Sequence, residues 1–370
     1  MSIVRSVRTF VMGDPQAPFA AMMAVLDRHG LLVGDRLRID ARLVCVGDYF
    51  DYDLDDPVAA GLEGLRALRW LASHDPEQVI LLAGNHDVAR VMELASINDA
   101  SFARARALGR DIAKTKQREG QAAADRRERD EFLPAFPTIP TYGLASRDYA
   151  SFSSEQRALV VELMLAGRLR LAFAGTLTDG RDVLVTHAGV STRELHLLGL
   201  PSARDPSHIA AALDARFTAA VDDVRADWRR GVITPLSLEP VHLAGCAGEE
   251  GGGLLYHRPA DPARPGADRG WELNPERPRR FDPATLPPGL TQLAGHTGHR
   301  KCLAELGDTW PTARARAHSK GGIRTLRAAG DGITYDMGIL ACASNVADLI
   351  LCDGEMRHVP PHEYGLVELV

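Results

Sequence analysis

Short runs of apolar residues recur along the chain, and a polar block follows most of them. The runs have the length of buried β-strands and are bounded by glycine, aspartate or histidine. We expect strands at 9–12, 43–46, 79–82, 183–186 and 290–294, and in the tail at 332–335, 346–351 and 364–370. Each polar block then lies at the mouth of a strand.

Segments with helical spacing of apolar residues separate several of these runs. Residues 19–29 and 58–73 lie between the first three runs, and 154–171 and 204–230 flank the fourth. In the second segment the spacing places four leucines on one face: Leu62, Leu65, Leu68 and Leu71. The alternation of strand and helix predicts an α/β fold whose site lies beyond the carboxyl ends of its strands.

Two segments interrupt this rhythm. Residues 88–136 are rich in alanine and in charges of both signs, which predicts a helical insert. The insert is either a solvated helical face or a cap over the site. Residues 257–288 carry eight prolines and little periodicity, which predicts a long irregular loop near the site. Neither segment divides the chain, so we expect one domain over residues 1–370.

The polar blocks carry the candidate chemistry. They are Gly13-Asp14-Pro15-Gln16, Gly47-Asp48-Tyr49-Phe50-Asp51, Gly84-Asn85-His86-Asp87, Thr186-His187-Ala188-Gly189 and Gly295-His296-Thr297-Gly298-His299. Aspartate, asparagine and histidine are the ligands of a hard-to-borderline divalent metal ion. A single histidine is most often structural, but five such blocks at strand ends predict one metal site at a sheet edge.

The ligand set is large enough for two ions. Two neighbouring ions need a bridging carboxylate, and Asp48 is the best candidate because its block lies between the others. Asp14 would then serve the first ion, and Asn85, His187 and His296 the second. Mixed oxygen and nitrogen donors suit manganese, iron or zinc better than magnesium.

Composition narrows the setting. The chain is 45% hydrophobic and 25% charged, which is typical of a globular protein. Its net charge of -6 argues against nonspecific binding to nucleic acid. The five cysteines form no C-x-x-C pair, as expected for reduced thiols. With no long apolar stretch at the N-terminus or elsewhere, we expect a cytoplasmic protein without a membrane segment.

The blocks resemble the signature of the calcineurin-like metallophosphoesterases. That signature runs Asp-x-His, Gly-Asp-x-x-Asp, Gly-Asn-His-Asp/Glu, a lone His, and Gly-His. Gly47-Asp48-Tyr49-Phe50-Asp51 with Thr186-His187-Ala188-Gly189 is most similar to the phosphoprotein phosphatase branch. This branch includes bacterial serine/threonine phosphatases and symmetrical dinucleoside tetraphosphate hydrolases. The resemblance runs from Gly13 to about Asp353.

The resemblance implies a fold and a reaction. The fold would be two mixed β-sheets packed as a sandwich with helices outside, an αββα arrangement of four layers. The activity would be hydrolysis of phosphomonoesters with two divalent ions, in which a metal-bound water or hydroxide attacks phosphorus. His86 would protonate the leaving oxygen, and Asp51 would orient and charge His86. An aspartate–histidine pair suits this role because it forms a general acid with a tunable pKa.

The first metal position departs from the family pattern. Gln16 stands where the family has a histidine, and an amide oxygen is a weaker ligand than imidazole for these metals. His299, shortly after the Gly-His pair, either compensates as a further ligand or is a surface residue. We therefore include both Gln16 and His299 in the candidate metal set.

The segment that holds the substrate phosphate in the phosphatase branch also departs from the family pattern. Tyr52-Asp53 replaces the Arg-Gly that commonly follows Gly-Asp-x-x-Asp, and that arginine holds phosphate in the phosphatase branch. A bidentate arginine matters for phosphate, so another would replace it. Arg258, Arg90 and Arg300 each lie near a motif, and we favour Arg258.

Three functions remain open at this point. The favoured one is a phosphomonoesterase acting on a small molecule or a phosphoprotein, with compact esters preferred if 88–136 and 257–288 roof the site. The second is hydrolysis of a symmetrical dinucleoside polyphosphate. The third is a non-catalytic metal- or phosphate-binding module, since Gln16 and Tyr52 could mark decay. Against decay, six residues of the signature are present: Asp48, Asp51, Asn85, His86, His187 and His296.

Overall fold

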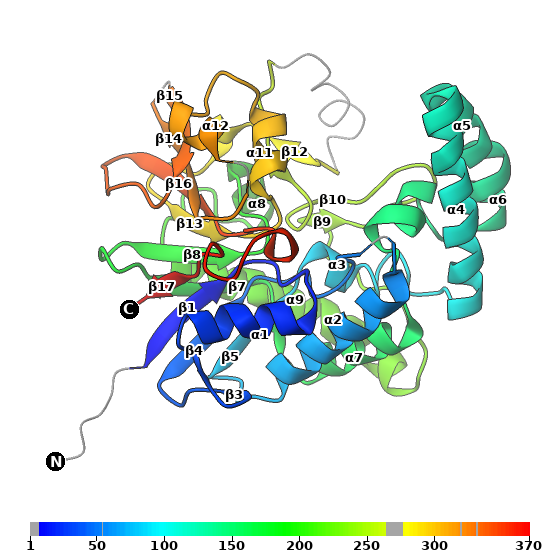
Figure 1. Cartoon of the computed structure of the whole chain (residues 1–370), viewed down its shortest axis with the longest axis horizontal. Coiled ribbons are helices and arrows are strands. Elements are labelled where there is room, and N and C mark those ends of the chain that lie inside the picture. The colour runs from blue at the N-terminus through cyan, green and yellow to red at the C-terminus, as the bar shows by residue number, and fades with distance from the viewer. Residues whose placement is uncertain (1–6, 54, 264–276, 319, 331) are drawn as a thin grey trace.

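Two β-sheets form the centre of the molecule in the computed structural model, which describes residues 7–53, 55–263, 277–318, 320–330 and 332–370 (Figure 1). The first sheet has the strand order β17-β1-β4-β5-β6. Its strands are β1 (Arg8–Met12), β4 (Ala41–Cys45), β5 (Val79–Leu82), β6 (Leu169–Arg170) and β17 (Val367–Leu369). β1, β4, β5 and β6 run parallel, and β17 pairs antiparallel with β1.

The second sheet has the order β15-β14-β16-β13-β8-β7. Its strands are β7 (Ala172–Thr176), β8 (Asp182–Thr186), β13 (Thr291–Ala294), β14 (Arg324–Ala329), β15 (Gly332–Met337) and β16 (Val346–Leu351). β16, β13 and β8 are parallel neighbours, whereas β7, β14 and β15 pair antiparallel. Both sheets are therefore mixed, as the resemblance implied.

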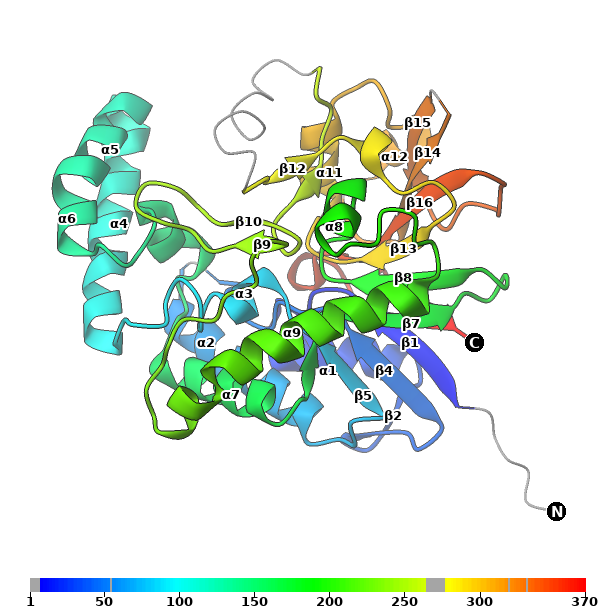
Figure 2. The same ribbon diagram turned by 180° about the vertical axis from the view of Figure 1, so that it is seen from behind.

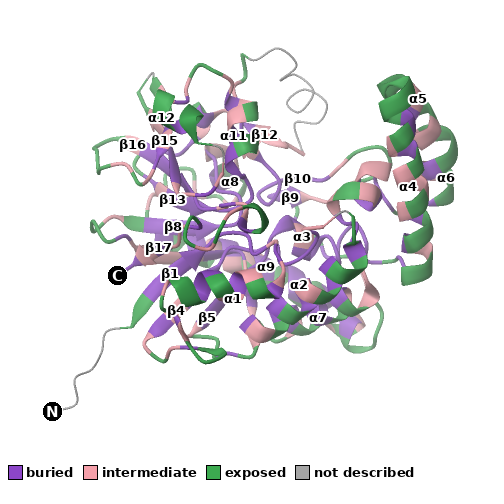
Figure 3. Ribbon diagram, in the orientation of Figure 1, coloured by how far each residue is buried: buried purple, intermediate pink, exposed green. Residues whose placement is uncertain are grey.

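The two sheets pack face to face because each strand is apolar on both sides. Alternate residues of a strand point to opposite faces, so Val11 and Val44 point into the space between the sheets. Their partners there come from the second sheet and include Val185, Leu293 and Ile350. Figure 3 shows buried residues concentrated in these central layers. Burial on both faces explains why the strand runs are almost continuously apolar.

Helices cover the outer faces. α1 (Phe19–Arg28) and α2 (Pro57–Ala72) share a core with the outer residues of the first sheet. α11 (His299–Leu306) and α12 (Ala313–Ala317) pack with the outer residues of the second sheet. The core that contains α1 and α2 also contains residues of α7 (Ser154–Leu165), α8 (Thr192–Leu197) and α9 (Pro206–Arg229). The expected sandwich with helices outside is confirmed.

Most expected elements are present within a few residues, with instructive exceptions. The expected helix 154–171 ends at Leu165, where the chain turns into β6. β7 and β14 were not expected. Leu62 is 59% exposed, although its three companion leucines are buried. It lines a cavity of about 280 Å³ between α2 and the insert instead of reaching the core.

The insert is helical, as predicted. After α3 (Asn85–Val88), it comprises α4 (Asp99–Glu119), α5 (Gln121–Arg127), a π-helical turn at Glu128–Phe132 and α6 (Leu133–Ala135). α4 begins at the side-chain cap of Asn98 and ends at Gly120, whose φ is 91°. Phe102 and Phe132 belong to a small core that the insert shares with the following segment, including Tyr149 and Phe152. Figures 1 and 2 show α4–α6 as an arm on one flank, so the interpretation as a cap is not retained.

The expected proline-rich loop 257–288 begins beside the strand ends. β11 (Arg258–Pro259) pairs with β12 (Arg280–Phe281), and residues 264–276 of the loop lie outside the described part. The other short elements are β2 (Leu32–Val33), β3 (Arg36–Leu37), β9 (His242–Leu243), β10 (Gly252–Gly253), and the turns Leu144–Asp148, Pro283–Thr285 and Met356–His358. Every helix that the structure describes is too short or too polar to cross a membrane. The single-domain division of the chain stays a prediction.

Candidate metal centre

The polar blocks of the two sheets meet at one place. In the first sheet, Asp14, Asp48 and Asn85 follow β1, β4 and β5, which are parallel neighbours. His187 and His296 follow β8 and β13 of the second sheet. Carboxyl ends of parallel strands share one sheet edge, and all five side chains are buried there. The sequence expectation of one site at the strand ends is therefore consistent with the structure.

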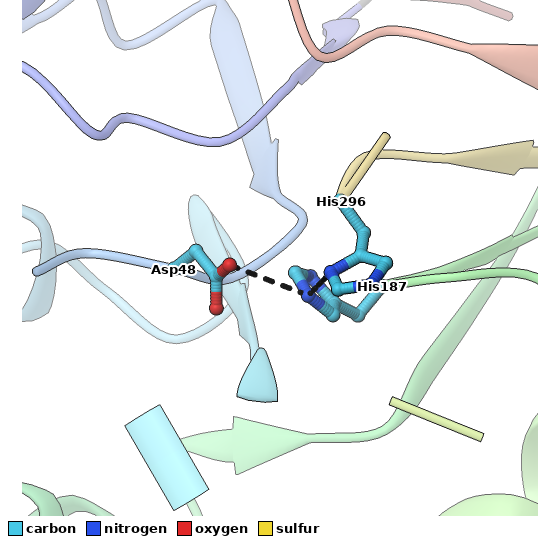
Figure 4. A group of neighbouring side chains, drawn as sticks. All are labelled: Asp48, His187 and His296. Carbon is cyan, nitrogen blue, oxygen red and sulfur yellow. Dashed lines mark hydrogen bonds and ion pairs between the residues drawn. The ribbon is translucent and has the colours of Figure 1, made fainter. Parts of the chain in front are cut away.

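Four atoms converge in this site, three neutral acceptors and one carboxylate oxygen. The Nε2 atom of His187 lies 3.1 Å from Asn85 Oδ1, 3.1 Å from His296 Nδ1 and 3.5 Å from Asp48 Oδ2. Figure 4 shows Asp48, His187 and His296 pointing toward one another. Asp48, His187 and His296 form a group whose ligand atoms lie within 4.8 Å of one another.

Backbone carbonyls set the tautomers of both histidines. His187 Nδ1 lies 2.8 Å from the Val46 carbonyl oxygen, and His296 Nε2 lies 3.0 Å from the Tyr256 carbonyl oxygen. Each of these nitrogens must carry the proton to donate to a carbonyl. The facing atoms, His187 Nε2 and His296 Nδ1, are then both lone pairs and cannot hydrogen-bond to each other. A cation between them resolves this conflict, so the donor set fits a metal ion.

Burial keeps these histidines neutral. It lowers the pKa of His187 and lowers the pKa of His296 well below its ordinary value, with the positive charge of Arg258 adding to the effect on both. Neutral imidazole is the form that binds metal. Burial also raises the pKa of Asp14 well above its ordinary range, and the carboxylates of Asp353 and Asp48 raise it further. A bound cation would relieve this crowding of negative charge.

Close packing of the loops explains the glycines of the blocks. A Cβ atom on Gly84 would lie 2.2 Å from Asp48 Oδ1, and one on Gly295 would lie 2.0 Å from Asp14 Oδ1. Asp48 and His296 have φ angles of 60° and 61°, a region that non-glycine residues rarely adopt. Such strain concentrates at functional sites.

Asp51 and His86 form the expected pair. His86 Nδ1 lies 3.0 Å from Asp51 Oδ2, and Ser151 donates to Asp51 Oδ1 through its backbone N–H and its hydroxyl. Burial raises the pKa of Asp51, but Arg90 and these hydrogen bonds outweigh it and lower it to about 2. Burial lowers the pKa of His86, but the carboxylates of Asp48 and Asp51 raise it to about 9. Asp51 is thus ionised at neutral pH, and in the metal-free protein the two carboxylates favour the protonated form of His86.

Gln16 and His299 lie in different surroundings. The Gln16 amide donates to the Phe50 carbonyl oxygen at 3.0 Å, and its side chain lines a cavity of about 210 Å³ with Asp14 and Asp51. His299 is buried away from this cluster. Its Nδ1 lies 2.7 Å from the Tyr335 hydroxyl and its Nε2 lies 3.0 Å from the Ala315 carbonyl oxygen. With both nitrogens engaged, His299 is neither the compensating ligand nor a surface residue.

The three candidate arginines separate clearly. Arg258 is half-buried and lowers the pKa of both metal-site histidines, and its Nε atom has no hydrogen-bond partner among the residues that the structure describes. Arg300 is exposed and lies 3.6 Å from Glu355. Arg90 is fully buried, with Nη2 2.7 Å from Asp51 Oδ2 and further bonds to Gln156. Arg90 is therefore committed to Asp51 and does not face a substrate.

Removing the Arg90 charge should cost stability. Arg90→Met leaves the Asp51 carboxylate buried without its cation, and breaking a buried pair costs about 3–5 kcal/mol. Urea unfolding of this variant should show that loss, while Arg300→Met, on the exposed arginine, should stay within about 0.5 kcal/mol of wild type. If Arg90→Met has normal stability and a raised KM, Arg90 binds substrate and does not serve mainly to pair with Asp51.

Several site residues were missed by the sequence reasoning. Lys301 and Arg357 line the 210 Å³ cavity beside Asp14, and Asp353 lies there too. Arg357 lies 3.0 Å from Asp53 and also donates to the Tyr52 carbonyl, so it occupies the loop where the family arginine is missing. Only Asp353 carried a signal, because Cys352-Asp353-Gly354 follows the apolar run 346–351 as the other blocks follow theirs.

Comparison with known proteins adds a family. A sequence profile described as calcineurin-like phosphoesterase matches residues 7–205, more than half of the 370-residue chain. Two solved structures of cold-active protein tyrosine phosphatase, one of them a mutant, match at 15% identity. The mutant match has a TM-score of 0.30 and covers 60% of this chain and 52% of the other. The second has a TM-score of 0.32 and covers 80% and 68%. At these scores neither supports an argument, and among curated proteins none matches.

Proposed function

Because the chain belongs to the calcineurin-like phosphoesterase family, and is therefore a metal-dependent phosphoesterase, we propose that it hydrolyses phosphomonoesters of small molecules with two divalent ions. The observation that carries the proposal is the convergence of His187 Nε2, His296 Nδ1 and Asn85 Oδ1, three acceptors without a proton to share. A cation satisfies such a set.

The residues would divide between two ions. Asp14 would serve the first ion, and Asp48 would contribute to both. Asn85, His187 and His296 would hold the second. Manganese, iron and zinc all suit this mixture of oxygen and nitrogen donors. When bound, such ions generate a nucleophile from water at neutral pH and neutralise charge on the phosphate.

The chain's own residues manage the leaving group. Asp51 accepts from the Nδ1–H of His86, which fixes the ring, and the His86 Nε2 atom then faces the metal site, 3.8 Å from Asp48 Oδ2. The Nε2 proton is the one available to the leaving oxygen. Because Arg90 keeps Asp51 ionised, the carboxylate holds the imidazolium without taking its proton. This is the arrangement of a general acid.

Phosphate recognition falls to Arg258. Its Nε atom is buried without a partner in the described part of the chain, and its charge lowers the pKa of His296. A phosphate oxygen at the site would satisfy that donor. Arg258→Ala should therefore raise KM by about 10- to 100-fold, the equivalent of one hydrogen bond to a charged group at ~1.5–3 kcal/mol. Steady-state kinetics would measure this, and Arg300→Ala is the matched control on the exposed arginine. Equal effects of the two substitutions would remove Arg258 from the phosphate site.

The substrate class is the finer part of the proposal. The cavity beside Asp14 has a volume of only about 210 Å³, and this size favours a compact substrate group. The helical arm α4–α6 stands on one flank (Figures 1 and 2), so the preference for compact esters rests on the size of this cavity and not on a roof over the site.

A substrate panel tests the function directly. Para-nitrophenyl phosphate, mononucleotides, phosphopeptides and a dinucleoside polyphosphate would be assayed with Mn²⁺, Fe²⁺, Zn²⁺ and Mg²⁺. We expect small phosphomonoesters to be turned over at least as well as phosphopeptides. A preference for the dinucleoside polyphosphate would favour that hydrolase instead. Metal binding without turnover of any substrate would indicate a non-catalytic module.

A further inference from the structure

The strand ends of the two sheets form matching rows of three. β1, β4 and β5 are parallel neighbours in the first sheet and lead into Asp14, Asp48 and Asn85. β16, β13 and β8 are parallel neighbours in the second sheet. β13 and β8 lead into His296 and His187, so the third place of this row belongs to the loop after β16. The acidic residue of that loop is Asp353, two positions beyond the end of the strand.

The end of β16 packs against the loops of two proposed ligands. The Cys352 N–H donates to the Ala294 carbonyl oxygen at 2.8 Å, beside the His296 loop. A Cβ atom on Gly13 would lie 2.1 Å from the Cys352 carbonyl oxygen, so the Asp14 loop is in contact as well. One on Gly298 would lie 3.3 Å from Asp353 Oδ2, which places this carboxylate against the His296 loop.

The Asp353 side chain faces the first-ion side of the site. Asp353, Asp14 and Gln16 line the same 210 Å³ cavity. Asp353 Oδ1 accepts the Glu355 N–H at 2.9 Å, and Oδ2 has no hydrogen-bond partner within the described ranges. A free carboxylate oxygen opposite Asp14 is suited to bind a cation.

A buried arginine fixes this loop without occupying the carboxylate. Arg324 on β14 is fully buried, and its Nη2 donates to the backbone carbonyl oxygens of Asp353 at 2.7 Å and Thr297 at 3.3 Å. Arg324 therefore ties the loop after β16 to the loop after β13 through their backbones. The position of Asp353 relative to His296 is set by the scaffold, as a metal ligand requires.

We propose that Asp353 is a ligand of the first metal ion, in the coordination place that Gln16 fills only weakly. This rests on the proposed two-ion function. It explains why the chain retains Asp14, Asp48 and the rest of the set without the family histidine. An anionic oxygen in that place also gives the first ion a harder ligand set than imidazole would, which shifts its preference toward manganese.

Titration of the metal-free protein with Mn²⁺ alone tests this. Wild type should bind two ions by calorimetry and elemental analysis. Asp353→Asn should weaken the first site by at least about the 10–100-fold that even outer-shell metal partners contribute, while the second site is unchanged. Glu355→Gln, a like change in the same cavity, should leave both affinities within about threefold of wild type. Adding Gln16→His to Asp353→Asn should restore at least part of the lost affinity.

Thermal unfolding separates a ligand from a structural role. A ligand facing Asp14 repels it in the metal-free protein, so metal-free Asp353→Asn should be at least as stable as wild type and gain less from Mn²⁺. A metal-free variant that is less stable yet binds both ions normally would overturn the inference. If wild type binds two ions and Asp353→Asn binds both with unchanged affinity, the Asp353 inference is overturned while the two-ion function stands. Binding of a single ion by wild type would instead overturn the two-ion function on which it rests.

Discussion

Asp48→Asn is expected to remove most activity and to reduce the bound metal from two ions to one or none. Asp48 Oδ2 lies 3.5 Å from His187 Nε2 and 3.8 Å from His86 Nε2. Asp48 Oδ1 accepts a hydrogen bond from the backbone N–H of His86 at 2.9 Å. The substitution keeps the volume of the side chain but removes the charge that would bridge both ions. Because outer-shell metal partners already contribute about 10–100-fold, the loss in kcat/KM should exceed 100-fold.

Elemental analysis and kinetics on the same preparation would check this expectation. Asp55→Asn is the matched control, because Asp55 is exposed a few residues further along the same loop. It should leave metal content and turnover unchanged. Normal metal content and normal turnover in Asp48→Asn would show that Asp48 bridges nothing, and the two-ion proposal would fail with it.

The centre of the fold was predictable because its signals are local. The apolar runs that lead into the site are buried on both faces, so they stand out from their neighbours without knowledge of their partners. A glycine near the end of several runs marks a close approach, as at Gly84 and Gly295, where any side chain would collide with Asp48 or Asp14. Such steric requirements leave a trace at a single position, and the strand ends could be identified from it.

The roles expected for His299 and Arg90 were wrong because they depend on the direction in which each side chain points. His299 follows His296 by three positions, but α11 begins there and turns its ring toward Tyr335. Arg90 lies one turn after His86 and points back to Asp51 across the loop. Proximity in sequence to a motif therefore predicts proximity in space, but not which group the side chain meets.

Long-range neighbours account for the remaining omissions. Asp353 becomes part of the site only because β16 lies beside β13, a pairing between strands separated by β14 and β15 in the sequence. The helical insert shows the same limit. Its charge pattern predicts helices with a solvated face, but nothing in that pattern says whether they cover the strand ends or stand beside them. Contacts with a later segment, around Tyr149 and Phe152, hold it on one flank (Figure 1).

His86→Asn should lower turnover by roughly the 10²–10⁴-fold typical of general acid catalysis, with metal content intact. His86 contributes its ring to the Asp51 pair, and no atom of the ring is among the three converging acceptors. The loss should be large for an alkyl phosphate, whose leaving oxygen needs a proton. It should be much smaller for para-nitrophenyl phosphate, whose leaving group is stable as an anion.

The ratio of the two losses is the informative quantity, because a general structural disturbance would reduce both rates alike. Asp51→Asn provides the second arm of the comparison. It removes the ionised carboxylate that, with Asp48, raises the pKa of His86 to about 9, so it should show the same dependence on leaving group with a smaller overall loss. Equal losses for both substrates in His86→Asn would exclude His86 as the acid. The site would then activate water without assisting departure, and a preference for substrates with good leaving groups should already be present in the wild-type enzyme.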